Sequence, residues 1–429
     1  MTSTGTANIG KDSAANRTDP IRSDVIILGA GLIGLTQALA LAAHGLRVAV
    51  IDRADPEVLK DAKHDGRVSS INSASWNIFE AIGLAEKLEP HGCNIDKILI
   101  NDSLKPGKVD FIPDEDDGPL GVMIQNNILQ RILFEAAAGN GMIDLYMPAQ
   151  VTEAERGEYQ VTVCLDGTME IGAQLAAPLL IAADGRGSRM RDEAGIIMAT
   201  WQYDHSAVIC TVTHEQPHGN TAYEIFYPSG PFAILPMRDD GSGQHRSAIV
   251  WSVPRKDGPA LAKINARAFE AELMKKSGGF LGQMKLHSDR ATYPLGFHHS
   301  DGLVSQRLAL VGDAGHGIHP IAGQGLNLGL RDVAALTECV VDGARTGLDL
   351  GDAQILARYD RWRGLDNLMM SAATDILTRL FGMPGDAPSA IRRFGMDIVQ
   401  RTGPLKDRFM AEARGESGDL PKMLMGDLV

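Results

Sequence analysis

The chemistry that this sequence can support is first visible in a glycine cluster near its beginning. Residues 25–28 are an apolar, largely β-branched run, residues 29–34 read GAGLIG, and an Ala/Leu-rich run follows. In a strand, turn and helix of this kind, Gly29 permits a tight turn, Gly31 lets the backbone approach a pyrophosphate, and Gly34 lets the helix pack against the strand. The cluster therefore predicts a turn that binds the pyrophosphate of a dinucleotide.

An acidic residue follows the next apolar run. The stretch LRVAVIDR, residues 46–53, places Asp52 at the tip of a second predicted strand. An acid at this position accepts hydrogen bonds from ribose hydroxyls. The neighbouring Arg53 keeps open the alternative of a ribose that carries a 2′-phosphate. The alternative is an ordinary turn whose loop is capped by Asp52. These residues predict an adenine dinucleotide without deciding between NAD and FAD.

A second glycine-rich stretch lies late in the chain. Residues 307–340 read as a strand that ends at Val311, a turn at Gly312-Asp313, a loop rich in Pro and Gly, and a helix from about Gln324. Glycines beside a helix N-terminus offer backbone N–H groups and a positive dipole end, which suit an electron-rich ring edge. Asp313, at a strand tip, could hold sugar-alcohol hydroxyls. We therefore expect this stretch to bind another part of the same long ligand.

The late stretch resembles the second flavin motif of aromatic hydroxylases related to para-hydroxybenzoate hydroxylase. Its segment HPIAGQGLNLGLRD, residues 319–332, is similar to the form found in ubiquinone-biosynthesis hydroxylases. The resemblance implies that the acid of the Gly-Asp pair binds the ribityl chain of FAD, the proline lies against the isoalloxazine, and the following segment borders its pyrimidine edge. By position these roles fall on Gly312, Asp313, Pro320, Gly323, Gln324, Gly325, Leu326 and Asn327.

Two further segments resemble motifs of the same family. LLIAADGRGSRMRDEAGI, residues 179–196, is similar to the family's Asp-Gly motif, which places Asp184 near the FAD pyrophosphate, although a strand that ends in an Asp-Gly turn is common. The segment from residue 64 resembles the Asp-x-Arg motif, which makes Arg67 a flavin contact; the alternative is a surface ion pair. Asn127 stands where the family often has an arginine, so that contact passes to Gln130 or Arg131.

The resemblance implies a reaction. FAD would be reduced by NADPH or NADH, O₂ would add at the flavin C4a, and the hydroperoxide would hydroxylate the aromatic ring of a polyprenylated phenol in ubiquinone biosynthesis. A related FAD-dependent epoxidase or polyprenyl reductase is one alternative, and a non-catalytic flavin-binding subunit is another. No catalytic acid or base is assigned; His319 and Tyr223 are candidates to line the site.

The motifs also predict the organisation of the chain. All of them must reach one ligand, so we expect an α/β fold with a discontinuous, Rossmann-like FAD-binding domain, a mixed-sheet substrate domain and a C-terminal helical region. The alternating β-branched and aromatic residues between 201 and 299 are typical of half-buried antiparallel strands. The predicted bounds are 20–75, 120–200 and 300–345 for FAD, 76–119 and 201–299 for substrate, 346–429 for the helices, and 1–19 for a disordered leader.

Composition and charge limit the classes of partner that we expect this protein to bind. The net charge of −13 argues against nucleic acid, because a phosphate-binding surface needs clustered Lys and Arg. Residues 25–46 have no charged side chain and are long enough to span a membrane, but the glycine turn within them favours strand and helix. His316 and His319 have metal-ligand spacing, yet Gly317 and Pro320 disfavour the regular helix such a pair needs, so no metal is expected.

We therefore expect a cytoplasmic enzyme that takes a hydrophobic phenolic small molecule. The tail of such a substrate partitions into lipid, so the prediction includes a peripheral contact with the inner membrane. A quinone-biosynthesis complex or a homo-oligomer is the expected assembly. The four widely spaced cysteines are expected to be buried small apolar residues in a reduced protein.

Overall fold

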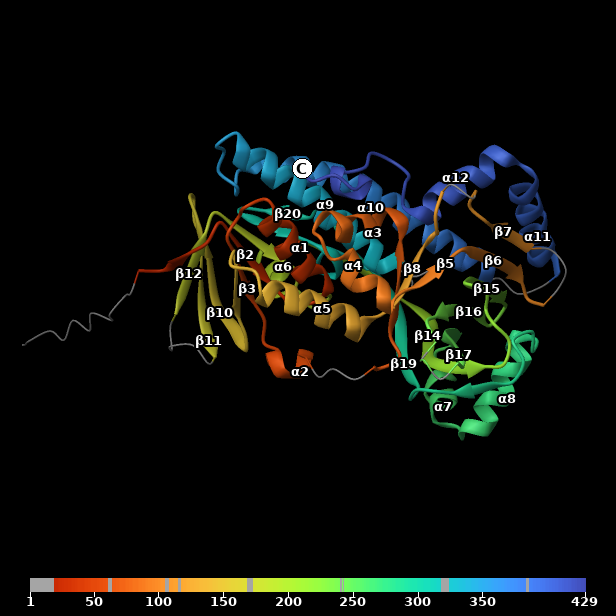
Figure 1. Ribbon diagram of the computed structural model, residues 1–429. Coiled ribbons are helices and arrows are strands. Elements are labelled where there is room, and N and C mark those ends of the chain that lie inside the picture. Colours follow the sequence, from red (N-terminus) through yellow and green to blue (C-terminus); the bar gives the residue numbers. More distant parts are fainter. Residues whose placement is uncertain are drawn as a thin grey trace, which may run out of the picture.

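The computed structural model describes residues 19–60, 64–104, 108–114, 117–167, 173–239, 241, 243–317, 324–382 and 386–429. Its strands form four sheets (Figure 1). A four-stranded sheet lies at one end of the molecule, the largest sheet lies at the other end, and the C-terminal helices run along one side. The predicted leader, residues 1–19, lies almost wholly outside the described residues.

A six-stranded sheet forms the centre of the first half of the molecule. Its order is β20-β21-β13-β2-β3-β9, and every pair from β21 to β9 is parallel. The central strands are continuous apolar runs with fully buried residues, as expected for parallel strands covered on both faces. The strands are β2 (Val25–Leu28), β3 (Val48–Ile51), β9 (Ile143–Tyr146), β13 (Leu179–Ala182), β20 (Val304–Ser305) and β21 (Leu308–Leu310).

Three long helices cover this sheet and pack on one another. Helix α1 contacts both α5 and α9, and the side chains between them join the largest hydrophobic core. Their bounds are α1 (Leu32–Ala43), α5 (Asn126–Ala138) and α9 (Gln324–Arg345). The short helices of this half are α2 (Pro56–Lys60), α3 (Ser73–Ala81), α4 (Ala85–Leu88) and α6 (Arg189–Glu193), with 3-10 turns η1 (Glu89–His91) and η2 (Gly312–Ala314).

The largest sheet has nine strands and is mostly antiparallel. Its order is β22-β19-β14-β17-β16-β15-β6-β7, with β18 beside β14. The strands are β6 (Lys97–Asp102), β7 (Lys108–Phe111), β14 (Met198–His214), β15 (Thr221–Tyr227), β16 (Gly230–Met237), β17 (His245–Pro254), β18 (Met284–Leu286), β19 (Ala291–Ser300) and β22 (His316–Gly317). Helices α7 (Gly258–Lys263) and α8 (Ala266–Ser277) cover one face.

The C-terminal helices approach the other face of the nine-stranded sheet. Helix α10 contacts β15 and β16, and α11 contacts β6 and β7, opposite the side that α8 covers (Figure 1). These elements are α10 (Ala353–Gly382), α11 (Asp386–Arg401), α12 (Gly403–Arg414) and the final 3-10 turn η4 (Lys422–Met425). The part of the sheet formed by β6, β7, β15 and β16 is therefore covered by the C-terminal helices.

Two smaller sheets complete the fold. The three-stranded sheet β4-β8-β5 contacts α9 through β4 and β16 through β5 and β8, so it connects the two halves of the molecule. Its strands are β4 (Val68–Asn72), β5 (Cys93–Ile95) and β8 (Gly121–Gln125). The four-stranded sheet β1-β12-β11-β10 consists of β1 (Ile21–Arg22), β10 (Ala149–Arg156), β11 (Val161–Gly167) and β12 (Gln174–Ala177).

The predicted fold class is confirmed: a mixed α/β architecture with C-terminal helices. The uncharged stretch 25–46 forms strand β2, a glycine turn and helix α1, as its glycines predicted. In the described part of the chain, no helix is both long and apolar enough to cross a membrane. The structure groups the strands of residues 201–299 in one sheet with β6 and β7 from 76–119; the exact domain bounds stay a prediction.

Candidate functional site

Four parallel strands place the predicted cofactor residues along one edge. In the order β21-β13-β2-β3, the residues that follow the strands are Asp313, Asp184, Gly29 and Asp52. Because parallel strands end at the same edge of a sheet, these residues lie side by side on what we call the carboxyl edge. Three strand spacings separate Asp52 from Asp313, which is about 14 Å. The edge can therefore hold an elongated ligand.

The glycine turn after β2 is shaped by close backbone approach. Gly29 has φ of +104°, and a Cβ there would lie 2.4 Å from the carbonyl oxygen of Ala183. A Cβ at Gly34 would lie 1.9 Å from the carbonyl oxygen of Gly29, whereas a Cβ at Gly31 would meet no atom within 4 Å. The first and third glycines thus hold α1 against the edge, and the second leaves open space at the helix N-terminus. That arrangement fits a pyrophosphate.

Asp52 fixes the neighbouring turn. Its Oδ2 accepts a hydrogen bond from the Ala30 N–H at 2.6 Å, and its Oδ1 accepts one from the Ala54 N–H at 2.7 Å. The side chain of Gln130 reaches the same turn from α5 and donates to the Ala30 carbonyl at 2.6 Å. Each carboxylate oxygen retains a second lone pair, so Asp52 can still accept from a ribose hydroxyl. Arg53 is exposed.

The loops after β13 and β21 are joined by a buried arginine. Arg191 Nη1 donates to the carbonyl oxygens of Arg186 at 2.9 Å and of Ala314 at 3.2 Å. Asp313 projects from the second loop with an exposed carboxylate, 4.0 Å from the Arg186 guanidinium. Both loops are therefore held together at the carboxyl edge, and the Asp313 carboxylate stays accessible to hydroxyl donors.

Asp184 is more enclosed. Its Oδ2 accepts a hydrogen bond from the Arg189 N–H at 3.1 Å. Burial raises the pKa of the Asp184 carboxyl, and hydrogen bonds from Ser188 and the backbone oppose the rise. The Asp184 carboxyl thus stabilises its own loop in part. An Asp in an ordinary Asp-Gly turn would do the same. Its predicted contact with FAD stays a prediction.

Arg67 forms an ion pair on the surface. Its Nε lies 2.6 Å from Oδ2 of Asp65, and both side chains are substantially exposed. The alternative interpretation of Arg67, a surface ion pair, therefore matches its contacts in the structure. Ion pairs of this kind are weak, so they do not prevent Arg67 from turning toward a ligand. Its flavin contact stays a prediction.

The start of α9 is tied to the three-stranded sheet. Asn327 is buried; its Nδ2 donates to the Ser70 carbonyl at 2.9 Å, and its Oδ1 accepts from the Asn72 N–H at 3.1 Å. Gly325 is exposed, and a Cβ there would meet no atom within 4 Å. Asn327 thus orients the first turn of α9, while Leu326 packs against the main core and Gln324 is half-buried. Pro320 and Gly323 lie outside the described residues.

Asp332, to which no sequence motif gave a role, organises the same region. Its Oδ2 accepts from the Gly312 N–H at 3.0 Å and lies 2.5 Å from His316 Nε2, and its Oδ1 accepts from Arg363 Nε at 2.8 Å. All of these groups are buried. Burial alone would raise the pKa of Asp332, but His316 and Arg363 lower it to about 2. The only signal in the sequence is an acid within the apolar run of α9.

The nine-stranded sheet presents an apolar face toward the C-terminal helices. We call it the inner face; it consists of the side chains of Ala222, Glu224 and Phe226 (β15), Ala233, Leu235 and Met237 (β16), and Arg246, Ala248 and Val250 (β17). Alternation along each strand assigns these residues to the side away from α8. Tyr223 is on the opposite face, where its ring lies 4.6 Å from that of Phe280, so it does not line the inner face.

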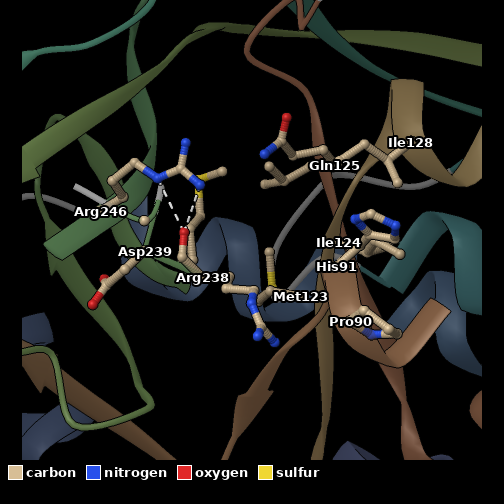
Figure 2. A pocket seen from close by; sticks show the side chains of 12 residues that line it. Pro90, His91, Met123, Ile124, Gln125, Ile128, Arg238, Asp239 and Arg246 are labelled. Carbon is tan, nitrogen blue, oxygen red and sulfur yellow. Dashed lines mark hydrogen bonds between the residues drawn. The ribbon is translucent and has the colours of Figure 1, made fainter. Parts of the chain in front are cut away.

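One end of the inner face opens into a cavity of about 330 Å³. Met237 and Arg246 line it from the nine-stranded sheet, and Val68, Met123 and Gln125 line it from the three-stranded sheet. Figure 2 shows Gln125 and Arg246 on opposite sides, with the Arg246 guanidinium bonded to the Arg238 carbonyl. Because Val68 directly follows Arg67, the cavity adjoins the segment predicted to contact the flavin.

Comparison with known proteins identifies the family. A family model described as an FAD binding domain matches residues 22–361. The ubiquinone hydroxylase UbiL of Rhodospirillum rubrum is 40% identical over 408 residues, which are 94% of this chain and 92% of that protein. The chain belongs to the FAD-dependent monooxygenases that include the ubiquinone hydroxylases. The predicted family resemblance is therefore confirmed, and so is the prediction of an FAD-dependent monooxygenase.

Two further comparisons agree with this family. The 3-demethoxyubiquinol 3-hydroxylase of Escherichia coli is 32% identical and covers 92% of this chain and 98% of its own length. Among solved structures, p-nitrophenol 4-monooxygenase PnpA from Pseudomonas putida superposes with a TM-score of 0.76 at 16% identity, covering 94% of this chain and 100% of that chain. The second likeness concerns the fold alone.

The residues at the carboxyl edge fit FAD. The open space at Gly31 suits an anion, the accessible carboxylates of Asp52 and Asp313 suit hydroxyl groups, and the exposed Gly325 in the first turn of α9 suits a ring edge. Within the described ranges, no group of three His, Cys, Asp or Glu side chains could hold a metal; His319 lies outside them. The individual FAD contacts stay predictions.

Proposed function

We propose that this protein hydroxylates the aromatic ring of a polyprenylated phenol in ubiquinone biosynthesis, with NADPH or NADH as reductant and O₂ as the source of oxygen. The observation that carries the proposal is near-complete alignment, at 40% identity, with a ubiquinone hydroxylase. The apolar inner face supports it, because a prenylated ring needs an apolar surface and one end of this face lines the cavity that Val68 also lines.

The cofactor supplies the oxygen chemistry: FAD, once reduced, activates O₂ and provides an electrophilic oxygen atom. The chain's part is to bind and orient. The N-terminus of α1 at Gly31 holds the pyrophosphate, Asp52 and Asp313 hold hydroxyls, and the α9 N-terminus meets the ring edge. Asp332 keeps the loop after β21 in register with α9 and α10, and the inner face excludes water from the substrate ring.

Turnover under ¹⁸O₂ tests the proposal. Purified protein loaded with FAD is given NADPH or NADH and a short-chain prenylated phenol. We expect faster oxidation of the nicotinamide when the phenol is present, and a ring-hydroxylated product that carries one ¹⁸O atom. A reduced product without ¹⁸O would support the reductase alternative, label on the prenyl chain would support the epoxidase, and no stimulation by any prenylated phenol would support a non-catalytic subunit.

The proposal extends to the cell. We infer a cytoplasmic enzyme that contacts the inner membrane peripherally and works in a quinone-biosynthesis complex or as a homo-oligomer. The support is the apolar tail of the substrate, which partitions into lipid. Metabolite profiling of a deletion strain identifies the step, because the accumulating quinone precursor lacks the hydroxyl group that this protein adds.

A further inference from the structure

Glu224 carries the only carboxyl group among the nine residues that define the inner face. Along β15, Tyr223, Ile225 and Tyr227 face α8, where the Tyr227 hydroxyl donates to the Lys276 carbonyl at 2.5 Å. Glu224 points the other way because side chains alternate along a strand. Only 9% of its surface is exposed, so a carboxyl group lies more than nine-tenths buried on the face beneath the C-terminal helices.

Glu224 has no partner in the described part of the chain. The residues directly opposite it are Ala233 on β16 and Ile100 on β6, and neither side chain has a polar group. Charged side chains on this side of the sheet include Arg246 of β17, which donates to the Arg238 carbonyl, and Asp102 of β6, which pairs with Arg392 of α11 at 3.4 Å. Burial raises the pKa of Glu224 to about 7, and no described charge opposes the rise. A buried carboxyl that has no partner is costly to fold.

The surroundings of Glu224 form an incompletely covered apolar surface. Across the sheet from Glu224, the row continues through Ala233, Val250 and Ile209. Val250 and Ile209 remain partly exposed although they belong to central strands whose other face is covered by helices. The same face leads along β16 and β17 to Met237 and Arg246, which line the cavity of Figure 2. Along this face the apolar side chains of Leu235 and Ala248 lie between the cavity lining and the row that contains Glu224.

We propose that Glu224 contacts the head ring of the substrate and accepts a hydrogen bond from its phenolic hydroxyl. This inference rests on the proposed function. The polar atoms of a prenylated phenol are confined to its head ring, so only that part of the substrate can satisfy a carboxyl on an apolar face. Glu224 then selects the head ring, rather than the prenyl tail, as the end of the substrate that binds on the inner face.

The contact also assists the reaction. As the ring carbon forms its bond to the incoming oxygen, electron density leaves the phenolic oxygen and its O–H proton moves to the Glu224 carboxylate. When that ring carbon then loses its hydrogen as a proton to solvent, aromaticity returns and Glu224 gives its proton back to the same phenolic oxygen. The carboxylate therefore ends unchanged, and the oxygen donor is supplied by the proposed activity.

Binding without turnover tests the contact. A short-chain prenylated phenol and its methyl ether, which lacks the O–H donor, are titrated into the oxidised FAD-loaded protein, and the change in flavin absorbance gives each affinity. In the wild type we expect the phenol to bind about tenfold more tightly than the ether at pH 8, and the ratio to shrink as the pH falls through about 7. Glu224→Leu should bring the ratio close to one, and Glu224→Gln should remove its pH dependence.

Glu155→Gln, which alters an exposed carboxyl on β10, is the matched control and should behave as the wild type. If the wild type hydroxylates the phenol while both Glu224 variants keep its ratio and pH dependence, the Glu224 contact is wrong and the proposed function stands. If the wild type shows neither binding nor product, the proposed function itself fails.

Thermal unfolding provides a readout that does not depend on substrate. A carboxyl whose pKa is raised in the folded state favours folding while it is protonated, and this contribution is lost as the pH rises from about 4.5 through about 7. Glu224→Gln should therefore raise the Tm at pH 8 and change it little at pH 5. A lower Tm at pH 8 would mean that Glu224 has a stabilising partner within the chain, which would overturn the inference.

Discussion

At the scale of single residues, Asp332 connects more of the site than any residue that the motifs named. Its two oxygens contact the loop after β21 through Gly312, strand β22 through His316, and helix α10 through Arg363. Asn367 adds a longer contact from the next turn of α10 at 3.4 Å. One buried carboxylate thus sets the position of the loop that carries Asp313 relative to two helices.

Replacing Asp332 should destabilise the fold around the site, and not only weaken ligand binding. Asp332→Asn removes one of the two carboxylates that pair with the buried Arg363 and leaves only Asp366, so we expect a loss of about 3 kcal/mol in the free energy of unfolding at pH 7. Urea unfolding of the apoprotein measures this. A companion variant, Asp349→Asn, breaks the partly exposed pair with Arg307 and should cost less. Equal losses in the two variants would contradict the central role of Asp332.

The same residue predicts a pH dependence. The pKa of Asp332 is lowered to about 2 in the folded state, so its contribution is present above its unfolded pKa near 3.8 and is lost as the pH falls through about 2. The stability difference between wild type and Asp332→Asn should accordingly narrow between about pH 4 and pH 2. A difference that stays constant over this range would show that the charge of Asp332 contributes nothing.

At the scale of elements, the strand, turn and helix formed by β2 and α1 assign different tasks to three glycines. Gly29 and Gly34 are required by the fold, since any Cβ would collide with backbone atoms. Gly31 is free of such contacts, so packing does not require a glycine there, and a closely approaching ligand accounts for it. All three glycines belong to one motif, so the sequence alone does not show which of them packing requires and which a ligand requires.

Alanine substitutions separate the two tasks. Gly34→Ala should destabilise the apoprotein by about 2 kcal/mol or more, because α1 must move away from β2. Gly31→Ala should change apoprotein stability by less than about 1 kcal/mol and weaken FAD binding by about tenfold or more. Fluorescence titration gives the FAD affinity, and Gly141→Ala, at an open loop position, is the control. Unchanged FAD affinity in Gly31→Ala would contradict pyrophosphate binding at this turn.

At the scale of the whole molecule, the C-terminal helices carry both a buried and an exposed apolar side. Met396 of α11 packs against the inner-face residues Ala222 and Leu235, whereas Phe394 and Ile398 of the same helix are exposed. Phe409 of α12 and Leu365, Leu368 and Met369 of α10 are exposed as well. These helices lie over the inner face, so a lipid surface docked on them would be next to the proposed substrate site (Figure 1).

Lipid vesicles test this surface. If it contacts a membrane, Phe394→Ser combined with Ile398→Ser should weaken co-sedimentation with lipid vesicles by about tenfold, because two large apolar side chains no longer leave water. Turnover of a water-soluble short-chain phenol should not change. Tyr159→Ser removes an exposed ring at the opposite end of the molecule, beside β10 and β11, and should bind vesicles as the wild type does. Undiminished binding of the double variant would place the membrane contact elsewhere.

Much of the cofactor site could be predicted because its information is local. The turn after β2, the acid after β3 and the Gly-Asp pair after β21 are each contained in a few consecutive residues, and the parallel order of the strands then brings them to one edge. A glycine-rich loop before an apolar run also predicted helix α9, which the structure describes from Gln324 onward.

The sequence by itself thus determined the family, the cofactor and the type of fold, because short motifs encode backbone shapes that depend on neighbouring residues. Only the tertiary structure decided that Asp332 joins His316 to Arg363, and that Glu224 rather than Tyr223 occupies the inner face. These properties depend on which side chains meet across distant segments and on which face of a strand is covered. Neighbouring residues of β15 point to opposite faces of the sheet, and no local sequence pattern shows what packs against each face.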